Sequence, residues 1–548
     1  MTATKYIFVT GGVLSGLGKG ITAASIANVL KERGVAVNMQ KFDQYINVDA
    51  GTLNPAEHGE VFVTDDGAET DLDLGHYERF LEQSLTRHSS VMTGAIYQGL
   101  IARERKGEFL GKTVQVIPHV TNEVKDRARR AAALDNFDVH IVEIGGTVGD
   151  DEGFHFIEAA RQMRLDEGRQ NVLYVHVVFL PYLKASEEVK TKPAQNSVRD
   201  LRSIGIQPDV LIARTDYDVK DDLVSKLSLY TNVEKEAILI LPTLPSVYEV
   251  PLLMEKRRLD EVIAGKLGLT LKERKPAWPA LVEKIKQRKP QLTIALVGKY
   301  TTMLDTYASV IEALKAACWQ AETDLNLRWI DSEILEEQGP ELFLKDAAGI
   351  VVPGGFGSRG IEGKITAIQY AREKMIPYLG LCLGMQLAVI EFARNVAGIT
   401  QATSEEFLTE GETERAPAQR SSAAAERSCV IHIMADQKTI TDKGGTMRLG
   451  GWDCVLTEGS FSREAYGQPQ IRERHRHRYE FNNDFRGKLE KAGLRIAGTT
   501  PNGKLVEIVE VANHPWFVGV QYHAEFTSRP TTGHPLFNAF IAAAKKTA

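Results

Sequence analysis

Cysteine is scarce in this chain, which has four in 548 residues and no CxxC spacing. The scarcity excludes a disulfide framework and a cysteine-based structural zinc site, and it leaves room only for an isolated reactive thiol. Long apolar runs are missing too, as is a basic leader followed by an apolar stretch, so we expect a cytoplasmic protein. A formal net charge of −6 means that there is no basic excess, which argues against nucleic acid as the main partner.

The length exceeds what one hydrophobic core can organise, and it predicts two or three domains. Short apolar runs alternate with helical segments over the first half of the chain. This alternation is typical of a parallel sheet that is covered on both faces. The expected strands of the first half are 6–10, 35–42, 139–146, 172–181, 210–214 and 237–242.

A charged, proline-containing stretch at 271–290 is typical of a linker. A second alternation of strands and helices follows it. We therefore predict two doubly wound α/β domains, residues 1–270 and 291–548, joined by this linker. The expected strands of the second domain include 292–300, 350–357 and 378–384.

A glycine-rich loop, GGVLSGLGKG at residues 11–20, follows the first expected strand and opens a helix. Backbone amides at such a helix start converge on phosphate, and Lys19 would add a positive charge. The loop departs from the usual phosphate-loop pattern, because it has an extra residue and Gly20 stands where Ser or Thr would ligate magnesium. We interpret it as a nucleotide phosphate site, and the alternative is a glycine-rich turn without a ligand.

Without a hydroxyl at Gly20, magnesium would have to be held by carboxylates. Glu143 ends an apolar strand, which is where ligands bind in α/β sheets. Asp73 lies in a run, 65–80, that we expect to be too acidic for a buried helix; a solvated surface is the alternative for this run. Further phosphates could meet Lys41, Lys190, Lys192 and Lys226, although a single lysine is more often a surface residue.

A second candidate site centres on Cys382, which lies between small residues in GLCLG (380–384). The cysteine follows an apolar strand and precedes a helical segment, and this is the layout of a nucleophile elbow. The N-terminus of the helix favours a thiolate. A buried structural cysteine is the alternative, and the flanking glycines favour the nucleophile.

His523 and Glu525 stand two residues apart near the end of the sequence. On an extended segment both side chains project to one face, so the carboxylate can orient the imidazole. Gly354 and Gly355 follow another expected strand and offer N–H groups for an oxyanion. The segment 475–477 carries two histidines among arginines, which make cation binding unattractive, so we expect no metal at His475 and His477.

Five blocks of the first half, taken in order, resemble the CTP synthase family: 11–20, 45–80, VQVIPH (114–119), EIGGTVGD (143–150) and EVKTKP (188–193). In the second half PGGFG, GLCLGMQ and YHAEF resemble the triad segments of class I glutamine amidotransferases. The resemblance implies an N-terminal P-loop-like synthetase domain and a C-terminal class I glutaminase domain. It implies a ligase of pyrimidine biosynthesis that aminates UTP to CTP, using ATP and ammonia from glutamine.

The resemblance also implies roles for residues of the first domain. ATP phosphates would lie on the loop with Lys19, and Mg²⁺ would lie at Asp73 and Glu143. The nucleotide-binding positions that it implies are Ser15, Gly16, Leu17, Gly18, Lys19, Gly20, Lys41, Asp73, Asp150, Asp151, Glu152, Lys190, Thr191, Lys192, Pro193, Ala194, Gln195 and Lys226.

In the second domain the resemblance implies that Cys382 attacks the glutamine amide, that His523 carries the proton and that Glu525 positions His523. Gly354 and Gly355 would form the oxyanion hole. The implied glutamine-binding positions are Gly355, Leu383, Gly384, Met385, Gln386, Glu406 and Arg478.

Regulation and assembly are implied in the same way. GTP would activate glutamine cleavage near GGTMRLG (444–450), and CTP would inhibit by overlapping the UTP site. A homotetramer is implied, and filaments occur in the family.

Four positions depart from the family pattern. Gln44 and Ala50 replace prolines that would stiffen a loop, and Ala524 replaces the proline between the histidine and the glutamate of the triad. Pro242 begins a segment whose family equivalent contacts adenine, so we expect weaker discrimination for ATP than is usual in the family.

Two other functions stay open. Another ATP-dependent amidase-coupled synthetase, such as a cobyrinic-acid amide synthase, shares both parts, but EIGGTVGD and EVKTKP argue against it. A nucleotide-responsive scaffold without catalysis is disfavoured by the intact Cys382, His523 and Glu525. Residues 409–427 have few large apolar groups and are expected to form a mobile surface loop.

Overall fold

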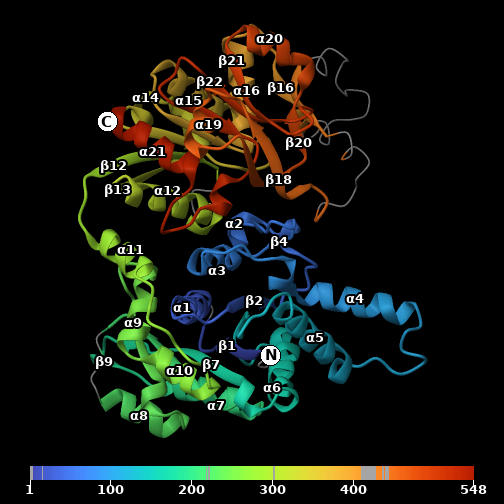
Figure 1. Ribbon diagram of the computed structural model, residues 1–548, viewed down its shortest axis with the longest axis vertical. Helices are drawn as coiled ribbons and strands as arrows, with labels where there is room; N and C mark the ends of the chain where they lie inside the picture. The colour runs from blue at the N-terminus through green and yellow to red at the C-terminus, as the bar shows by residue number, and fades with distance from the viewer. Residues whose placement is uncertain are drawn as a thin grey trace. The chain divides into compact units, whose positions relative to one another are not determined.

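The chain folds into two units, each built on its own sheet (Figure 1). The computed structural model describes residues 4–547, except 15, 218, 220–221, 300–302, 409–427, 435–436 and 438–443. The first unit is Met1–Ala50 with Asp73–Lys286, and the second is Gly51–Leu72 with Gln287–Ala548. Of the helices described, none is both long and apolar enough to cross a membrane.

The first unit contains a seven-stranded parallel sheet in the order β11-β10-β7-β1-β6-β2-β5. Its strands are almost entirely buried because helices cover both faces, and this confirms the six strands expected from apolar runs. The strands are β1 (Lys5–Gly11), β2 (Val37–Asp43), β5 (Ser90–Met92), β6 (Val139–Ile144), β7 (Val172–Phe179), β10 (Val210–Thr215) and β11 (Ile238–Pro242).

The helices of this unit follow the strands in the alternating order that the sequence predicts. β1 lies between β6 and β7, where the strand order reverses, so the loop after β1 occupies the usual ligand crevice of such a sheet. The main helices are α1 (Lys19–Glu32), α3 (Asp73–Leu81), α4 (Thr93–Arg105), α5 (Thr121–Ala132), α6 (Phe154–Asp166), α7 (Lys192–Ser203), α8 (Asp222–Thr231), α9 (Val250–Lys256), α10 (Leu259–Leu267) and α11 (Ala277–Lys286).

One expectation about this unit is wrong. The end of the acidic run 65–80 forms α3, and most of that helix is buried. Tyr77 and Phe80 fill the core, while the Glu78 carboxylate accepts a hydrogen bond from the Leu85 N–H at 2.8 Å. The buried carboxylate of Glu78 therefore has a hydrogen-bond donor inside the protein. A count of acidic residues in the sequence could not reveal this partner.

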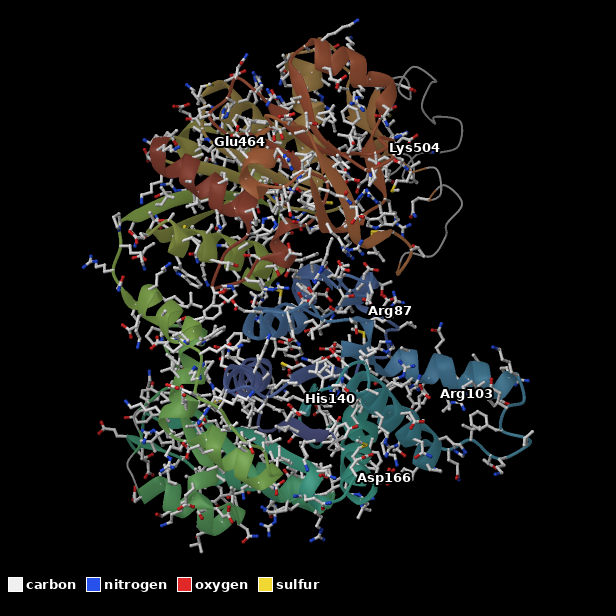
Figure 2. All side chains as sticks on the ribbon, in the orientation of Figure 1. Arg87, Arg103, His140, Asp166, Glu464 and Lys504 are labelled. Carbon is white, nitrogen blue, oxygen red and sulfur yellow. The ribbon has the colours of Figure 1, made fainter. Side chains whose placement is uncertain are left out.

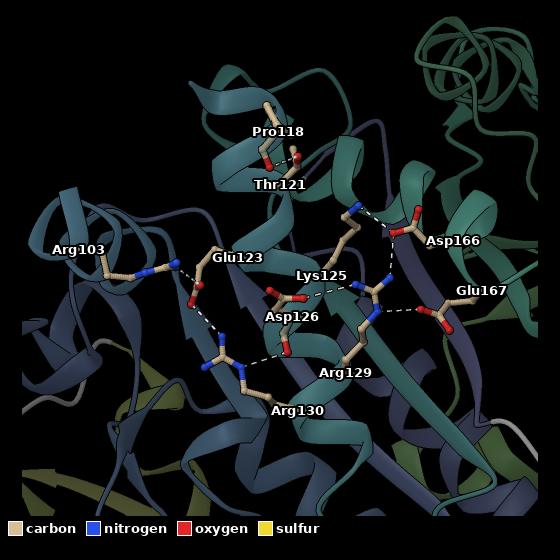
Figure 3. Close-up of polar contacts among 10 residues, drawn as sticks. All are labelled: Arg103, Pro118, Thr121, Glu123, Lys125, Asp126, Arg129, Arg130, Asp166 and Glu167. Atoms are coloured by element: carbon tan, nitrogen blue, oxygen red, sulfur yellow. Dashed lines mark hydrogen bonds and ion pairs between the residues drawn. The ribbon is translucent and has the colours of Figure 1, made fainter. Parts of the chain in front are cut away.

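Ion pairs connect α5 with the end of α6 (Figure 3). Lys125 and Arg129 each lie 2.8 Å from the Asp166 carboxylate of α6, and Arg129 also pairs with Glu167. Several of these groups are about one third exposed, so each pair adds little stability. The apolar face of α5, which is buried, supplies the main packing energy.

The sheet interior also contains a histidine, His140 on β6 (Figure 2). Its ring lies 3.1 Å from the Gln40 side chain, and burial lowers the pKa of His140 to about 3. The imidazole is therefore neutral and belongs to the core rather than to a reactive site.

The second unit contains a nine-stranded sheet in the order β13-β12-β14-β15-β23-β22-β21-β18-β19. The first five strands in this order are parallel, and the rest are antiparallel. The parallel part confirms a second α/β domain. The strands are β12 (Gln291–Gly298), β13 (Asp324–Asp331), β14 (Gly349–Val352), β15 (Tyr378–Leu381), β18 (Arg448–Leu456), β19 (Gln470–His477), β21 (Leu494–Thr499), β22 (Val506–Val511) and β23 (Phe517–Val520).

Helices pack on both faces of this sheet, and a small sheet of β16 (Thr403–Ser404), β17 (Cys429–Ile433) and β20 (Tyr479–Phe481) lies beside it. The expected loop 409–427 lies outside the described residues. The helices are α12 (Ala308–Gln320), α13 (Ser332–Gln338), α14 (Glu341–Leu344), α15 (Ile361–Glu373), α16 (Leu383–Asn395), α19 (Phe461–Tyr466), α20 (Arg486–Lys491) and α21 (Pro535–Thr547).

The boundaries of the two units differ from the predicted domains. Residues 51–72 come from the first half of the sequence, yet they cluster with the second unit. There the rings of Phe62 and Phe526 are 4.9 Å apart, and the Glu69 carboxylate pairs with Arg476 at 2.7 Å. The predicted linker 271–290 contains a helix, α11.

The buried Glu69–Arg476 pair yields a stability prediction. Glu69→Ala leaves the Arg476 guanidinium, which is 10 % exposed, without its carboxylate partner. We expect the free energy of unfolding to fall by about 3 kcal/mol in urea denaturation.

A matched control is Asp65→Ala, which breaks the exposed pair between Asp65 and Arg472. That loss should stay below about 1 kcal/mol. Equal losses in the two variants would show that burial does not govern these pairs.

Candidate active sites

The glycine-rich loop after β1 has an open helix N-terminus. Gly16 and Gly18 adopt φ angles of +69° and +87°, which glycine tolerates best. α1 has no side-chain cap and no acidic residue in its first turn, so its first amides face no carboxylate of their own helix. The Nζ of Lys19 donates to the Gly146 carbonyl at 2.7 Å. The loop thus suits an anion, as predicted; Ser15 lies outside the described residues.

Carboxylates converge beside this loop. A Cβ on Gly20 would lie 2.5 Å from Oδ1 of Asp73 and 3.4 Å from Oε2 of Glu143. These two residues stand more than 50 positions apart in the sequence, and the fold brings both to Gly20. The missing Ser or Thr at this position is therefore explained, because carboxylates occupy the space that a side chain would need.

Lys41 holds the carboxylates together. Its Nζ contacts Asp73 and lies 3.3 Å from Glu143 and 3.8 Å from Asp43. Burial raises the pKa of Glu143; burial also opposes the charge on Asp73, but the Lys41 charge outweighs it and lowers the pKa of Asp73. Tyr77 of α3 donates a hydrogen bond to Glu143.

The sequence interpretation missed Asp43 at this site. Asp43 ends β2, and burial raises the pKa of its carboxyl to about 6. The rule that singled out Glu143, a carboxylate at the carboxyl end of a strand, applies equally to Asp43 and could have found it.

Magnesium fits this arrangement as an ion shared with phosphate. Among the described residues, no three His, Cys, Asp or Glu side chains are grouped as a metal site. Mg²⁺ is usually held by one or two carboxylates together with substrate phosphates and waters. Asp73 and Glu143, which both point at Gly20 in the phosphate loop, are such a pair.

The predicted pyrimidine nucleotide positions fall into two groups. Thr191 and Lys226 line one pocket, together with Tyr182 and Asp222. Within the same segment Lys190 pairs with Glu188, Gln195 donates to the Thr191 hydroxyl, and Lys192, Pro193 and Ala194 begin α7.

The second group, Asp150 to Glu152, follows β6 instead. The Asp150 carboxylate accepts a hydrogen bond from the Thr147 N–H at 2.7 Å. Asp151 and Glu152 are exposed at the start of a 3₁₀ turn. Both are available to a ligand in solution.

Arg214 is another residue that the sequence interpretation missed. Its Nε would lie 4.0 Å from a Cβ on Gly18, and its Nη1 donates to the Pro242 carbonyl at 3.3 Å. Burial lowers the pKa of Arg214. Its guanidinium therefore lies between the phosphate loop and the divergent segment that begins at Pro242, and no local pattern in VLIAR indicated this.

Cys382 in the second unit has the backbone of a nucleophile elbow. Its φ is +50° with ψ −101°, a strained conformation for a residue with a side chain, at the turn from β15 into α16. Gln521 donates to its Sγ at 3.8 Å, and the sulfur lies 3.7 Å from the Arg476 carbonyl. The elbow prediction is confirmed in geometry.

His523 and Glu525 make the expected contact, with Nδ1 of His523 2.7 Å from Oε1 of Glu525. Their local structure differs from the prediction, because the segment is not extended: Glu525 lies in a 3₁₀ turn, Ala524–Thr527, that begins after His523. Burial lowers the pKa of His523, but the charges of Glu525 and Cys382 outweigh it and raise this pKa to about 10.

Gly354 packs against both reactive side chains. A Cβ at Gly354 would lie 2.8 Å from Cε1 of His523 and 3.7 Å from Cβ of Cys382. A side chain at this position would collide with the His523 ring, so glycine lets the backbone pack directly against the two reactive residues.

A pocket of about 200 Å³ opens over the triad. Its walls include Gly354 and Gly355, as expected, but also Phe356 and, from the 51–72 segment, Pro55, Glu60 and Val61. That segment belongs to the second unit only through tertiary contacts, so the sequence did not indicate this wall.

Of the predicted glutamine contacts, Gly355 lines this pocket, and the others make contacts of their own. Leu383, Gly384 and Met385 begin α16, and the Gln386 amide donates to the Tyr479 carbonyl at 2.9 Å. The Glu406 carboxylate accepts from the Gly357 N–H at 2.9 Å, and Arg478 donates to Thr446 at 2.7 Å. Thr446 lies in the 444–450 segment, which the fold therefore joins to a predicted glutamine contact.

His475 and His477 contact each other, and Nε2 of His475 lies 3.7 Å from the Glu507 carboxylate. Their ring nitrogens are 3.1 Å apart, and Nδ1 of His477 lies 2.9 Å from the Tyr479 carbonyl. Burial lowers the pKa of both rings well below the usual value. They are neutral core residues at neutral pH.

The raised pKa of His523 depends on Glu525, and this can be tested. In Glu525→Gln the imidazolium loses its carboxylate, so the His523 limb of the pH–rate profile should shift to lower pH. Glutamine hydrolysis near pH 8 should fall on the order of 10³-fold. Glu458→Gln, an exposed change in the same unit, is the control, and an unshifted profile in Glu525→Gln would contradict the assignment.

Comparison with known proteins covers almost all of the chain. A family model described as CTP synthase N-terminus matches residues 5–269, and one described as glutamine amidotransferase class-I matches residues 302–543. The CTP synthase of Carboxydothermus hydrogenoformans is 54% identical over 545 residues, which cover 99% of both chains. The CTP synthase of Geobacillus kaustophilus is 51% identical and covers 99% of this chain and 100% of its own.

A solved structure is also similar in sequence to the second half. The glutaminase domain of Trypanosoma brucei CTPS with bound acivicin is 38% identical, covers 46% of this chain and 94% of its own, and has a TM-score of 0.40. Because both family models match in order and the relatives align from end to end, the chain belongs to the CTP synthase family.

Proposed function

We propose that this protein makes CTP from UTP, ATP and glutamine, with the two half-reactions at the two sites described above. The observation that carries the proposal is the presence, in one chain, of a Cys–His–Glu triad and a phosphate loop facing paired carboxylates. Family membership along the full length supports the same reaction. An amidase-coupled synthetase of another family would not share that length of similarity.

In the second unit, the Cys382 sulfur attacks the amide carbon of glutamine. His523 passes a proton to the leaving ammonia and then takes one from the water that hydrolyses the thioester, while Glu525 holds Nδ1 of His523. The N–H groups at Gly354 and Gly355 stabilise the oxyanion. Glu406 and Arg478 bind the charged amino-acid end of the substrate.

In the first unit, the loop amides and Lys19 bind the ATP phosphates, and the γ-phosphoryl group is transferred to O4 of UTP. Ammonia then forms a bond with C4, and phosphate leaves. Mg²⁺ bound by Asp73 and Glu143 would neutralise phosphate charge during the transfer. Lys41 keeps the two carboxylates beside the loop.

The proposed enzyme is regulated by nucleotides and assembles into oligomers. GTP acts as an activator of glutamine cleavage near 444–450, CTP is a feedback inhibitor at the pyrimidine nucleotide site, and the enzyme assembles as a homotetramer, with filaments as a further assembly. Ammonia travels between the sites without being protonated, through an internal passage. The cytoplasm is the proposed location.

Because the two half-reactions use separate sites, a variant in the glutaminase site should lose glutamine-dependent synthesis and keep ammonia-dependent synthesis. Cys382→Ala should reduce glutamine-dependent CTP synthesis on the order of 10³-fold or more, because the nucleophile is gone. Synthesis from added ammonia should stay at the wild-type rate, since that chemistry uses the first unit. UTP conversion is followed by absorbance with either nitrogen donor, and equal loss with both would contradict the division.

The carboxylate pair predicts the complementary result. Glu143→Gln and Asp73→Asn should each suppress synthesis from glutamine and from ammonia alike, because phosphoryl transfer precedes amination. The loss should be about 10²-fold or greater, in line with removal of a transition-state charge contact. Glu234→Gln, an exposed carboxylate of the same unit, is the control. Wild-type turnover in either variant would remove that residue from the metal site.

A further inference from the structure

Lys364 is a fully buried lysine in the first turns of α15, where 0 % of the residue is exposed to solvent. Its Nζ has no hydrogen-bond acceptor among the described residues. Buried ammonium groups in proteins are nearly always paired, because removing an ion from water is costly. Something other than stability must explain this side chain.

The ammonium lies behind the loop that carries the oxyanion hole. A Cβ on Gly355 would be 3.8 Å from Nζ of Lys364 and 3.8 Å from Cε of Lys299. Lys299 is engaged, since its Nζ donates to the Gly357 carbonyl at 3.3 Å, while the Gly357 N–H donates to Glu406. Lys299 therefore anchors the loop through a hydrogen bond, whereas Lys364 lies beside the loop without one among the described residues.

Charged groups from several elements face Lys364. Burial is the main cause that lowers the pKa of Lys364, to about 7; Lys299 at the end of β12 and Arg359 lower it further, while Glu406 and Asp331 at the end of β13 oppose the decrease. Two other cations and two carboxylates thus surround the ammonium. The two carboxylates do not offset the effect of burial, because the pKa of Lys364 remains lowered.

We propose that Lys364 is a positioning residue of the glutaminase, which fixes the Gly354–Gly355 peptide for oxyanion binding and adds positive potential behind it. This inference rests on the proposed function of the second unit. Glycine peptides rotate readily, and the charge of a neighbouring ammonium favours the orientation in which carbonyl oxygens turn toward the ammonium and N–H groups turn away from it, toward the substrate. Positive charge within the protein also favours the developing oxyanion.

The proposal gives the pH dependence a definite sign. Lys364 is protonated below pH 7 and loses its proton above it, so its contribution to glutamine hydrolysis fades as the pH rises. The ratio of wild-type to Lys364→Met kcat/KM cancels the titration of groups that the two enzymes share. This ratio should be about tenfold at pH 6, carried by kcat rather than by KM, and should approach one at pH 9.

Stability should change in the opposite direction. Because folding lowers the pKa of this base, its burial opposes folding fully below pH 7, and the opposition is lost as the pH rises toward the unfolded value of 10.5. Lys364→Met keeps an unbranched side chain of similar length. Its Tm at pH 6 should therefore equal or exceed that of the wild type.

The experiment measures glutamine hydrolysis by the full-length enzyme from pH 6 to pH 9, with Tm and ammonia-dependent synthesis recorded for each variant. Lys374→Met, which changes an exposed lysine just after α15, is the matched control and should behave as wild type throughout. A ratio that falls with pH, with unchanged ammonia-dependent synthesis, supports the proposal.

Two results would overturn it: a ratio that stays at one or does not vary with pH, or a lowered Tm, which would make Lys364 a structural residue. Cys382→Ala is assayed alongside. Hydrolysis by Cys382→Ala at the wild-type rate would reject the proposed function itself, whereas loss there with a flat Lys364→Met ratio would reject only the role of Lys364.

Discussion

A parallel sheet delivers the carboxyl ends of all its strands to one edge, and both units depend on this constraint. In the first unit it gathers the loop after β1, Asp43 at the end of β2 and Glu143 near the end of β6. In the second it places the Gly354 loop after β14 beside Cys382 after β15. Groups that are far apart in the sequence thereby meet without long connecting loops, and the helices that return the chain shield them from water.

Buried charge is handled differently in the two units. In the first, Lys41 lies near three carboxylates, so the buried cation and the buried anions stabilise one another before any ligand arrives. In the second, the imidazolium of His523 is supported by Glu525, but Lys364 has no hydrogen-bond partner among the described residues. A cluster of paired charges suits a site that binds a charged nucleotide, whereas an unpaired ammonium suits a site where negative charge appears only during the reaction.

Close packing explains why glycine stands at the reactive positions. At Gly20 a side chain would collide with Asp73, and at Gly354 it would collide with His523. Cys382 has a strained backbone with a positive φ angle, and this conformation directs its sulfur out of the turn. Strain and the loss of side chains are tolerated there because the surrounding strands and helices are fully buried and fix the local geometry.

The sequence by itself determined six strands of the first sheet, the strands β12, β14 and β15 of the second, the phosphate loop and the cysteine elbow, because apolar runs, glycine spacing and the strand–turn–helix order are local properties. It was misleading for 65–80, where acidity suggested solvent although α3 is buried, and for the backbone of 523–525. Only the tertiary structure decided that 51–72 forms a wall of the glutaminase pocket and that Arg214 and Lys364 lie at the sites. The physical reason is that the environment of a charge is set by the groups that folding brings to it from distant segments, and no window of neighbouring residues contains that information.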